Sequence, residues 1–325
     1  MKVAQICGNS GVMSLLRRSP LPPAALFAGP DGVGKRSAAL ALAARWNCRR
    51  PVDDDSCGVC VSCVKAEAGN HPDIQLFLPE KNVIKIESMR ELAREAHYRP
   101  FEGTARFFII DQAEKMTEEA ANSLLKTLEE PPDTSHLALV TAYPNRLLST
   151  ILSRCQSFAF HALTREEIAG YLASSGASDG VQLRAAFADG SIGKALALDL
   201  ETLIKDRDAA LELLEAWTKS RVFEVIFKRL EAAPFRADIK SRDRVKTYLE
   251  LLQSIAEDLY FLMVHTPDRV VNLDRRERLE RLADDLTLDW VRNLLYHIGQ
   301  SYWDVEHYVS PLMCLETLWL RADAR

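Results

Sequence analysis

The sequence predicts an α/β fold: a domain built on a parallel sheet, followed by a small helical domain and a larger all-α domain. Three observations lead to this prediction. In the first half of the chain, short apolar runs alternate with amphipathic helical patterns. A glycine-rich segment joins one of these runs directly to a helical pattern, and strand patterns end after about residue 161. Strands separated by helices pair in parallel, and the helices cover both faces of the sheet.

Five apolar runs are the predicted strands, and the amphipathic segments between them are the predicted helices. The runs are Ala24–Ala28, Ile74–Leu78, Phe107–Ile110, Leu137–Thr141 and Phe158–Phe160. The helical segments are Ser37–Trp46, Ile86–His97 and Thr117–Glu130. The last of these has the clearest boundaries, because its first residue is a good N-cap and Pro131 and Pro132 follow its end.

Helical spacing dominates the rest of the chain. Leu163–Ala173 and Val181–Ala188 predict short helices, and from about residue 201 the pattern is almost wholly helical. A break between helices is expected at Pro234 and in the charged stretch Arg236–Arg244. We therefore expect an α/β domain at residues 1–161, a small helical lid domain at 162–202 and a C-terminal helical domain at 203–325.

The composition is that of a folded protein that does not bind DNA on its own. Of the 325 residues, 47% are hydrophobic and 27% are charged, which suits a chain with two or three buried cores. The formal net charge is −5, whereas an independent DNA-binding protein usually has a basic excess. No stretch has the roughly 18 apolar residues that a membrane helix needs, and the N-terminus lacks a signal-peptide pattern. We expect a cytoplasmic protein, with no membrane partner, whose seven cysteines are reduced.

The segment Gly29-Pro-Asp-Gly-Val-Gly-Lys35-Arg36 is typical of a phosphate-binding loop. It follows the first predicted strand and begins the next helix, which is the order that phosphate binding requires. Gly29, Gly32 and Gly34 let backbone N–H groups face an anion, and Lys35 can reach its outer phosphates. The alternative is a glycine-rich turn that only begins a helix.

The residue after the lysine departs from the pattern of magnesium-dependent loops. Such loops have Ser or Thr there, and the hydroxyl holds the metal ion, but this sequence has Arg36. Ser37 comes one place late and, on a helix, points about 100° away. The sequence therefore predicts phosphate binding, with ATP as the candidate ligand, but not magnesium coordination or hydrolysis.

The strand Phe107–Ile110 ends in Asp111, the position that helps to hold magnesium in loop-type ATPases. ATPases of the expected class place a glutamate next, as the base that activates water. Here that position is Gln112, whose amide can position a water but cannot take its proton. Glu114 lies two residues further on and is a poor substitute. With Lys35, these residues predict a degenerate ATPase site; the alternative is a strand that happens to end in acidic residues.

Four cysteines within a short polar segment predict a structural zinc site: Cys48, Cys57, Cys60 and Cys63. Four thiolates can surround one zinc ion tetrahedrally, and closely spaced cysteines in a reducing compartment bind metal more often than they pair. With all four ligands from the protein, the metal has no open position for catalysis. An iron–sulfur cluster and an empty, vestigial site are the alternatives. The other three cysteines are isolated and are expected to be packing residues.

The order of these motifs resembles the clamp-loader branch of the AAA+ ATPases. The resemblance includes Gly29–Lys35, the four cysteines, Phe107–Asp111, Asn122–Pro132 and Ser153-Arg154-Cys155, and it extends from about residue 5 to about residue 200. It implies a hetero-pentameric ring that opens a sliding clamp and places it on primer-template DNA. It also implies that Arg154 acts in trans on ATP bound by the adjacent subunit, and that the C-terminal helices form a collar.

Among clamp-loader subunits, the sequence resembles the delta-prime type. A gamma/tau subunit, which hydrolyses ATP, is expected to have Ser or Thr at position 36, Glu at position 112 and an arginine where Gly193 lies. All three are missing here, whereas Arg154 is present. The delta type is expected to lack the four cysteines and the Ser-Arg-Cys motif. The resemblance thus implies partners of the gamma/tau and delta types and little or no ATPase activity in this chain.

Three other functions stay open at this point. A gamma/tau-type subunit would hydrolyse ATP at a rate that depends on Lys35. A P-loop nucleotide kinase would need a pocket for a phosphate acceptor and, usually, further arginines in a lid. An interaction scaffold would bind no nucleotide, and Gly29–Lys35 would be a relic.

Overall fold

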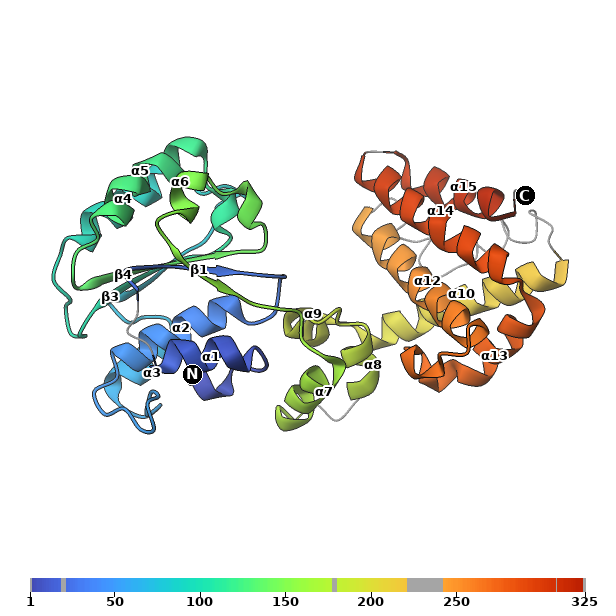
Figure 1. The fold of residues 1–325 in the computed structure, drawn as a ribbon, viewed down its shortest axis with the longest axis horizontal. Helices are drawn as coiled ribbons and strands as arrows, with labels where there is room; N and C mark the ends of the chain where they lie inside the picture. The colour runs from blue at the N-terminus through green and yellow to red at the C-terminus, as the bar shows by residue number, and fades with distance from the viewer. Residues whose placement is uncertain (1, 19–21, 177–179, 221–241, 308, 324–325) are drawn as a thin grey trace. The chain divides into compact units, whose positions relative to one another are not determined.

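The apolar runs of the first half form a parallel sheet of five strands (Figure 1). Its strand order is β2-β3-β4-β1-β5, and every neighbouring pair is parallel. The strands are β1 (Ala24–Ala28), β2 (Ile74–Phe77), β3 (Arg106–Ile110), β4 (Ser135–Thr141) and β5 (Gln156–Ala159). The predicted parallel sheet is therefore confirmed, with shifts of one or two residues at the strand ends.

The molecule is a computed structural model that describes residues 2–18, 22–176, 180–220, 242–307 and 309–323. The chain forms two compact units, Met1–Ala197 and Leu198–Arg325. The helix break predicted at Pro234 lies outside the described residues. The domain boundaries predicted after residues 161 and 202 stay a prediction.

Helices cover both faces of the sheet in the N-terminal unit (Figure 1). The described helices of the whole unit are α1 (Ser10–Arg18), α2 (Lys35–Trp46), α3 (Val61–Glu67), α4 (Ile86–Ala96), α5 (Glu118–Glu129), α6 (Ser149–Leu152), α7 (Arg165–Ser174), α8 (Val181–Ala186) and α9 (Ile192–Ala197), with short 3-10 helices at Val3–Gln5, Ala113–Lys115 and Pro144–Arg146. Alternate residues of β1 point to opposite faces. Ala25 and Phe27 pack with α1 and α2, whereas Ala24 and Leu26 pack with α4 and α5. Full burial of such a Phe or Leu side chain contributes about 1.5–3 kcal/mol.

Local signals set the helix boundaries. The Thr117 hydroxyl accepts a hydrogen bond of 3.2 Å from the backbone N–H of Ala120, so the predicted N-cap of α5 is confirmed. Thr164 caps α7 in the same way, and the Glu167 carboxylate accepts a hydrogen bond from the backbone N–H of Thr164. This reciprocal pair satisfies two N–H groups that have no partner within the helix.

The segment α7–α9 has a small apolar core of its own within the N-terminal unit. Leu163, Ile168, Leu172, Ala185 and Ala195 are buried there. Residues 189 and 190 adopt left-handed conformations that turn the chain into α9. This turn brings the start of α9 to the glycine-rich loop, as described below.

The C-terminal unit is helical, as predicted. Its helices are α10 (Leu200–Ser220), α12 (Arg242–Met263), α13 (Arg276–Asp285), α14 (Leu288–Glu306) and α15 (Pro311–Asp323), with 3-10 helices at Pro267–Arg269 and Leu273–Arg275. Trp217 lies between Trp290 and Trp319, with ring centroids 6.3 and 5.9 Å away. The fully buried Arg207 guanidinium donates to both Asp274 carboxylate oxygens, at 2.8 and 2.5 Å. Among the described helices, none is both long enough and apolar enough to cross a membrane.

Candidate functional site

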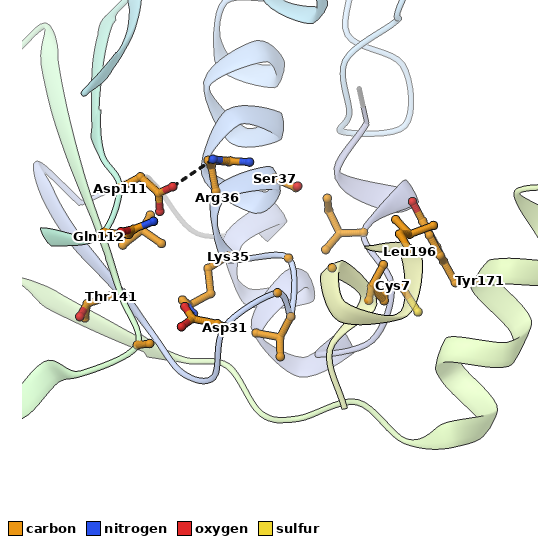
Figure 2. A pocket seen from close by; sticks show the side chains of 18 of the residues that line it. Cys7, Asp31, Lys35, Arg36, Ser37, Asp111, Gln112, Thr141, Tyr171 and Leu196 are labelled. Atoms are coloured by element: carbon orange, nitrogen blue, oxygen red, sulfur yellow. Dashed lines mark hydrogen bonds and ion pairs between the residues drawn. The ribbon is translucent and has the colours of Figure 1, made fainter. Parts of the chain in front are cut away.

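A cavity of about 520 Å³ lies where the glycine-rich loop meets the carboxyl ends of β3 and β4 (Figure 2). One wall is polar and comes from the loop, the start of α2 and the residues that follow the strands. The other wall is largely apolar and includes Ile6, Tyr171, Ile192 and Leu196. Clefts at the carboxyl ends of parallel strands are the usual ligand sites of such folds, and this volume is within the ordinary range for ligand pockets.

Glycine is required at two places in the loop. Gly34 is the N-cap of α2 with φ of 94°, and Gly32 has φ of 72°. The backbone N–H of Gly193 donates to the Gly32 carbonyl at 3.1 Å, and a Cβ atom at Gly32 would collide with the Ser191 side chain. The loop is thus packed directly against the start of α9. Gly29, also predicted as a site residue, is not among the residues that line the cavity.

Lys35 lies at the polar end of the cavity and is held by its own loop. Its Nζ donates to the carbonyls of Gly29 and Pro30, both at 2.5 Å, and lies 3.9 Å from the Asp31 carboxylate. Burial lowers the pKa of Lys35, and the nearby carboxylates of Asp31 and Asp111 oppose that shift. A phosphate group would therefore compete with these carbonyls for the ammonium.

Arg36 and Asp111 form an ion pair inside the cavity wall. Arg36 Nη1 donates to Asp111 Oδ2 at 3.1 Å. The Asp111 side chain is 11% exposed and the Arg36 side chain is 54% exposed. Figure 2 shows Ser37 on the other side of Arg36 from Asp111, as its place on the helix predicts. A magnesium ion would find Asp111 already paired and no hydroxyl beside it, so the residues do not fit the metal.

The position after Asp111 has no group that can take a proton from water. Gln112 is exposed and adopts a left-handed conformation with φ of 51°. The Glu114 carboxylate accepts a hydrogen bond of 2.7 Å from the Thr141 hydroxyl at the end of β4, and it does not line the cavity. Because the Glu114 carboxylate is bonded to Thr141, it is a poor substitute for the missing catalytic base, as predicted from its position in the sequence.

The sequence pattern found the polar wall of the cavity but missed the apolar wall. Gly32, Gly34, Lys35, Arg36, Ser37 and Asp111 all line the cavity. Cys7, Tyr171 and Leu196 also line it, and the fold brings them there from three distant segments. In the sequence, Asp189 and Gly190 could have indicated a turn before α9, but not the segment against which α9 packs.

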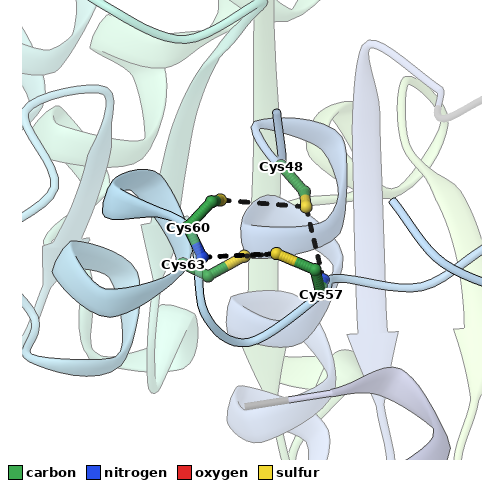
Figure 3. A group of neighbouring side chains, drawn as sticks. All are labelled: Cys48, Cys57, Cys60 and Cys63. Atoms are coloured by element: carbon green, nitrogen blue, oxygen red, sulfur yellow. Dashed lines mark hydrogen bonds between the residues drawn. The ribbon is translucent and has the colours of Figure 1, made fainter. Parts of the chain in front are cut away.

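The four predicted metal ligands lie together (Figure 3). Their sulfur atoms all lie within 4.8 Å of one another, with Cys48–Cys60 and Cys57–Cys63 separations of 4.0 and 3.9 Å. Zinc–sulfur bonds of about 2.3 Å in a tetrahedron require sulfur atoms about 3.8 Å apart. The thiols are free, and the geometry therefore fits a single zinc ion held by Cys48, Cys57, Cys60 and Cys63.

Local structure positions these cysteines. Cys48 follows the end of α2, Cys60 is the N-cap of α3 and Cys63 lies within α3. The backbone N–H groups of Cys57 and Cys60 donate to the sulfur atoms of Cys48 and Cys57, both at 3.3 Å. Burial raises the pKa of Cys60, but hydrogen bonds from backbone N–H and thiol groups outweigh it and lower that pKa to about 6. These hydrogen bonds therefore favour the thiolate, which is the form that binds a metal ion.

A buried hydrogen-bond chain joins this cysteine module to the sheet. Ser62 Oγ donates to the Asn47 carbonyl at 2.7 Å and lies 3.0 Å from His71 Nε2. The backbone N–H of Asp73 donates to His71 Nδ1 at 3.1 Å. Burial lowers the pKa of His71, so the neutral ring with a proton on Nε2 fits both contacts. These hydrogen bonds connect α3 to the segment that leads into β2.

Arg154 lies between α6 and the edge strand β5, and it is not among the residues that line the cavity. Its Nη1 donates to the Thr150 carbonyl at 2.9 Å, and its Nη2 donates to Glu129 Oε1 at 2.5 Å. The side chain is 32% exposed. The guanidinium is thus held in one orientation but stays open to solvent.

Known proteins resemble this chain over most of its length. A family model described as "DNA polymerase III, delta subunit" matches residues 12–164. DNA polymerase III subunit delta' of Bacillus subtilis is 31% identical over 295 residues, which are 89% of this chain and 88% of that protein. DNA polymerase III subunit tau of Escherichia coli is 33% identical over 258 residues, but these cover 71% of this chain and 40% of that protein. A gamma subunit-related protein of Thermotoga maritima is 19% identical, with a TM-score of 0.41 over 85% of this chain and 97% of that chain.

Proposed function

Because this chain belongs to the DNA polymerase III clamp-loader family, as a member of the delta-prime type, we propose that it assists ATP-dependent loading of the sliding clamp onto primed DNA. It does so as one subunit of a hetero-pentamer with gamma/tau-type and delta-type subunits, and its C-terminal helices contribute to the collar. The clamp and the primer-template DNA are reached through this complex. The proposed location is the cytoplasm.

The observation that carries this proposal is the position of Arg154. Its guanidinium is fixed by Glu129 and the Thr150 carbonyl, is open to solvent and lies outside the lining of its own cavity. An arginine supplied from a neighbour stabilises the charge that develops during phosphoryl transfer. Arg154 is therefore proposed to act in trans, on ATP bound by the adjacent subunit.

The chain's own cavity is proposed to hold a nucleotide without hydrolysing it. Lys35 and the loop amides supply the phosphate-binding groups. Gln112 cannot act as a base, and Glu114 is bonded to Thr141. Without a base or a metal site, phosphoryl transfer loses two of its main sources of rate acceleration.

Cys48, Cys57, Cys60 and Cys63 are proposed to hold one structural zinc ion. The ion would cross-link the loop after α2 to the start of α3, a segment that otherwise has little apolar content to bury. The metal would supply folding energy and no catalysis, because the four thiolates leave no open coordination position.

The test uses the reconstituted loader with clamp and primed DNA. Arg154→Ala is expected to leave the chain folded and the complex assembled, and to lower ATP hydrolysis. Loss of a trans arginine costs about 10³–10⁵ in rate at the affected site. Arg165→Ala, at an exposed arginine that begins α7, is the matched control and is expected to have no effect. An assembled Arg154→Ala complex with the wild-type rate would refute the proposal.

A gamma/tau-type ATPase is the second candidate, since Lys35 and the cavity are both present and a tau protein is among the relatives. It differs in one measurable property, namely steady ATP turnover that is lost in Lys35→Ala. Arg36 and Gln112 favour the first proposal.

A further inference from the structure

The Arg36–Asp111 ion pair lies where a magnesium-dependent site would have the metal and its two protein ligands. In such sites a hydroxyl after the lysine and a strand-end aspartate both hold the ion. Here the guanidinium takes the place of the hydroxyl and bonds to the aspartate at 3.1 Å. Magnesium prefers nearly octahedral oxygen coordination and gives up its water reluctantly, so it competes poorly with this pair.

The charges of the site compensate for a missing metal ion. Arg36 in place of a hydroxyl makes the site more positive by one charge. Gln112 in place of a glutamate makes it more positive by another. Relative to a magnesium-dependent site, one positive charge is added and one negative charge is removed, and this net change of two equals the charge of Mg²⁺. Two other carboxylates remain near Lys35: Asp31, which is 77% exposed and therefore screened by solvent, and Glu114, which accepts a hydrogen bond from Thr141 and does not line the cavity.

The guanidinium can contact Asp111 and a ligand together. It has five N–H groups, one of which bonds to Asp111, and about half of the side chain is exposed at the cavity. A guanidinium can donate two parallel N–H···O hydrogen bonds to the oxygens of one phosphate group. Lys35 lies beside it, and the apolar wall with Tyr171, Ile192 and Leu196 offers a surface for a base.

We propose that this cavity binds a nucleoside di- or triphosphate without magnesium, and that Arg36 performs the charge-neutralising role of the metal ion. This inference rests on the proposed binding of nucleotide in the chain's own cavity. It does not depend on the action of Arg154 in a neighbouring site.

The experiment measures binding of fluorescent ADP and ATP analogues by anisotropy to the purified full-length chain. One buffer is freed of divalent ions by a chelating resin before protein is added, so that zinc stays in the cysteine module. The other contains excess magnesium. Arg36→Thr restores the hydroxyl and removes the guanidinium. Arg90→Thr is the control, at an exposed arginine within α4 that does not line the cavity.

The wild-type chain is expected to bind equally well, within about twofold, with and without magnesium. Arg36→Thr is expected to bind at least tenfold more weakly in the metal-free buffer and to recover when magnesium is added. The tenfold loss corresponds to about 1.4 kcal/mol. Arg90→Thr is expected to behave as wild type. Circular dichroism confirms that each variant is folded.

Two results would overturn the inference alone: wild-type binding that requires magnesium, or an Arg36→Thr variant that binds metal-free nucleotide as well as wild type. Absence of binding in both buffers would overturn the inference and the proposed nucleotide binding with it. Neither outcome touches the trans role of Arg154, which the loader ATPase measurement tests separately.

Discussion

Asp73 is a buried carboxylate on which the entry into the sheet depends, and its replacement gives a prediction that can be worked out in detail. Its side chain has no exposed surface. Oδ1 accepts a hydrogen bond from the backbone N–H of Phe101 at 2.7 Å, and Oδ2 accepts from Glu102 and Gly103 at 2.9 and 2.8 Å. Asp73→Asn keeps the size and one acceptor, but its NH₂ group faces either the Phe101 donor or the Glu102 and Gly103 donors, according to the orientation of the amide.

The magnitude follows from the donors that lose their partner. Each buried N–H without an acceptor costs about 1–3 kcal/mol. The buried Arg106, whose Nε lies 4.0 Å from Asp73, also loses a negative neighbour, although Glu95 still accepts from its Nη2 at 2.7 Å. We expect Asp73→Asn to lower the opening free energy of the sheet by about 3–5 kcal/mol.

The same contacts make this contribution depend on pH. Burial raises the pKa of Asp73, but the three backbone N–H groups outweigh it and hold the pKa below its ordinary value. The stabilisation by Asp73 is therefore complete above the pKa of this carboxyl in the unfolded chain, about 4, and is lost as pH falls through its lower pKa in the folded protein. The variant lacks this step.

Native-state hydrogen exchange at the β3 amides measures the opening of the sheet separately from the C-terminal unit. Asp133→Asn, at an exposed aspartate, is the matched control and is expected to change stability by less than about 0.5 kcal/mol. If Asp73→Asn and Asp133→Asn gave the same β3 protection, the account of this buried carboxylate would be wrong.

Two further predictions concern metal and turnover. Metal analysis of freshly purified protein is expected to find one zinc per chain. Cys60→Ser is expected to lose the metal and to weaken the protection of the β3 amides from hydrogen exchange, because three thiolates hold zinc less tightly than four. Zinc-free protein of normal stability would contradict this prediction. The isolated chain is expected to hydrolyse ATP far more slowly than ~1 s⁻¹, the low end for enzymes. The reason is that Gln112 stands in place of the base and the Arg36–Asp111 ion pair in place of the metal site. A rate near ~1 s⁻¹ would favour the gamma/tau-type function.

The elements and motifs that depend on neighbouring residues were predictable from the sequence. The strand runs, the Thr117 cap and the close approach of the four cysteines depend on local spacing, and the structure contains all of them. The contacts that decide the chemistry connect distant segments. Arg36 meets Asp111 across 75 positions and Arg154 meets Glu129 across 25. The pattern predicted that Arg36 could not replace a hydroxyl, but only the folded sheet brings its guanidinium to Asp111.

The cavity's apolar wall was also beyond the sequence pattern. Cys7 lies in the loop before α1, Tyr171 lies in α7 and Leu196 lies in α9, and no local pattern in these three segments indicates a shared site. Their shared position results from the turn at residues 189 and 190 and from the hydrogen bond between Gly193 and Gly32. Such long-range placement is a tertiary effect that hydrophobic periodicity does not encode.

The central claim is that Arg154 completes a reaction site in another subunit, and single-turnover hydrolysis in the assembled loader tests it most directly. Loaders containing wild type or Arg154→Ala are filled with radiolabelled ATP, triggered with clamp and primed DNA, and quenched at short times. The account predicts that the rapid phase loses the amplitude of one site in the variant, while the remaining sites react at their usual rate. A rapid phase of unchanged amplitude and rate would contradict it.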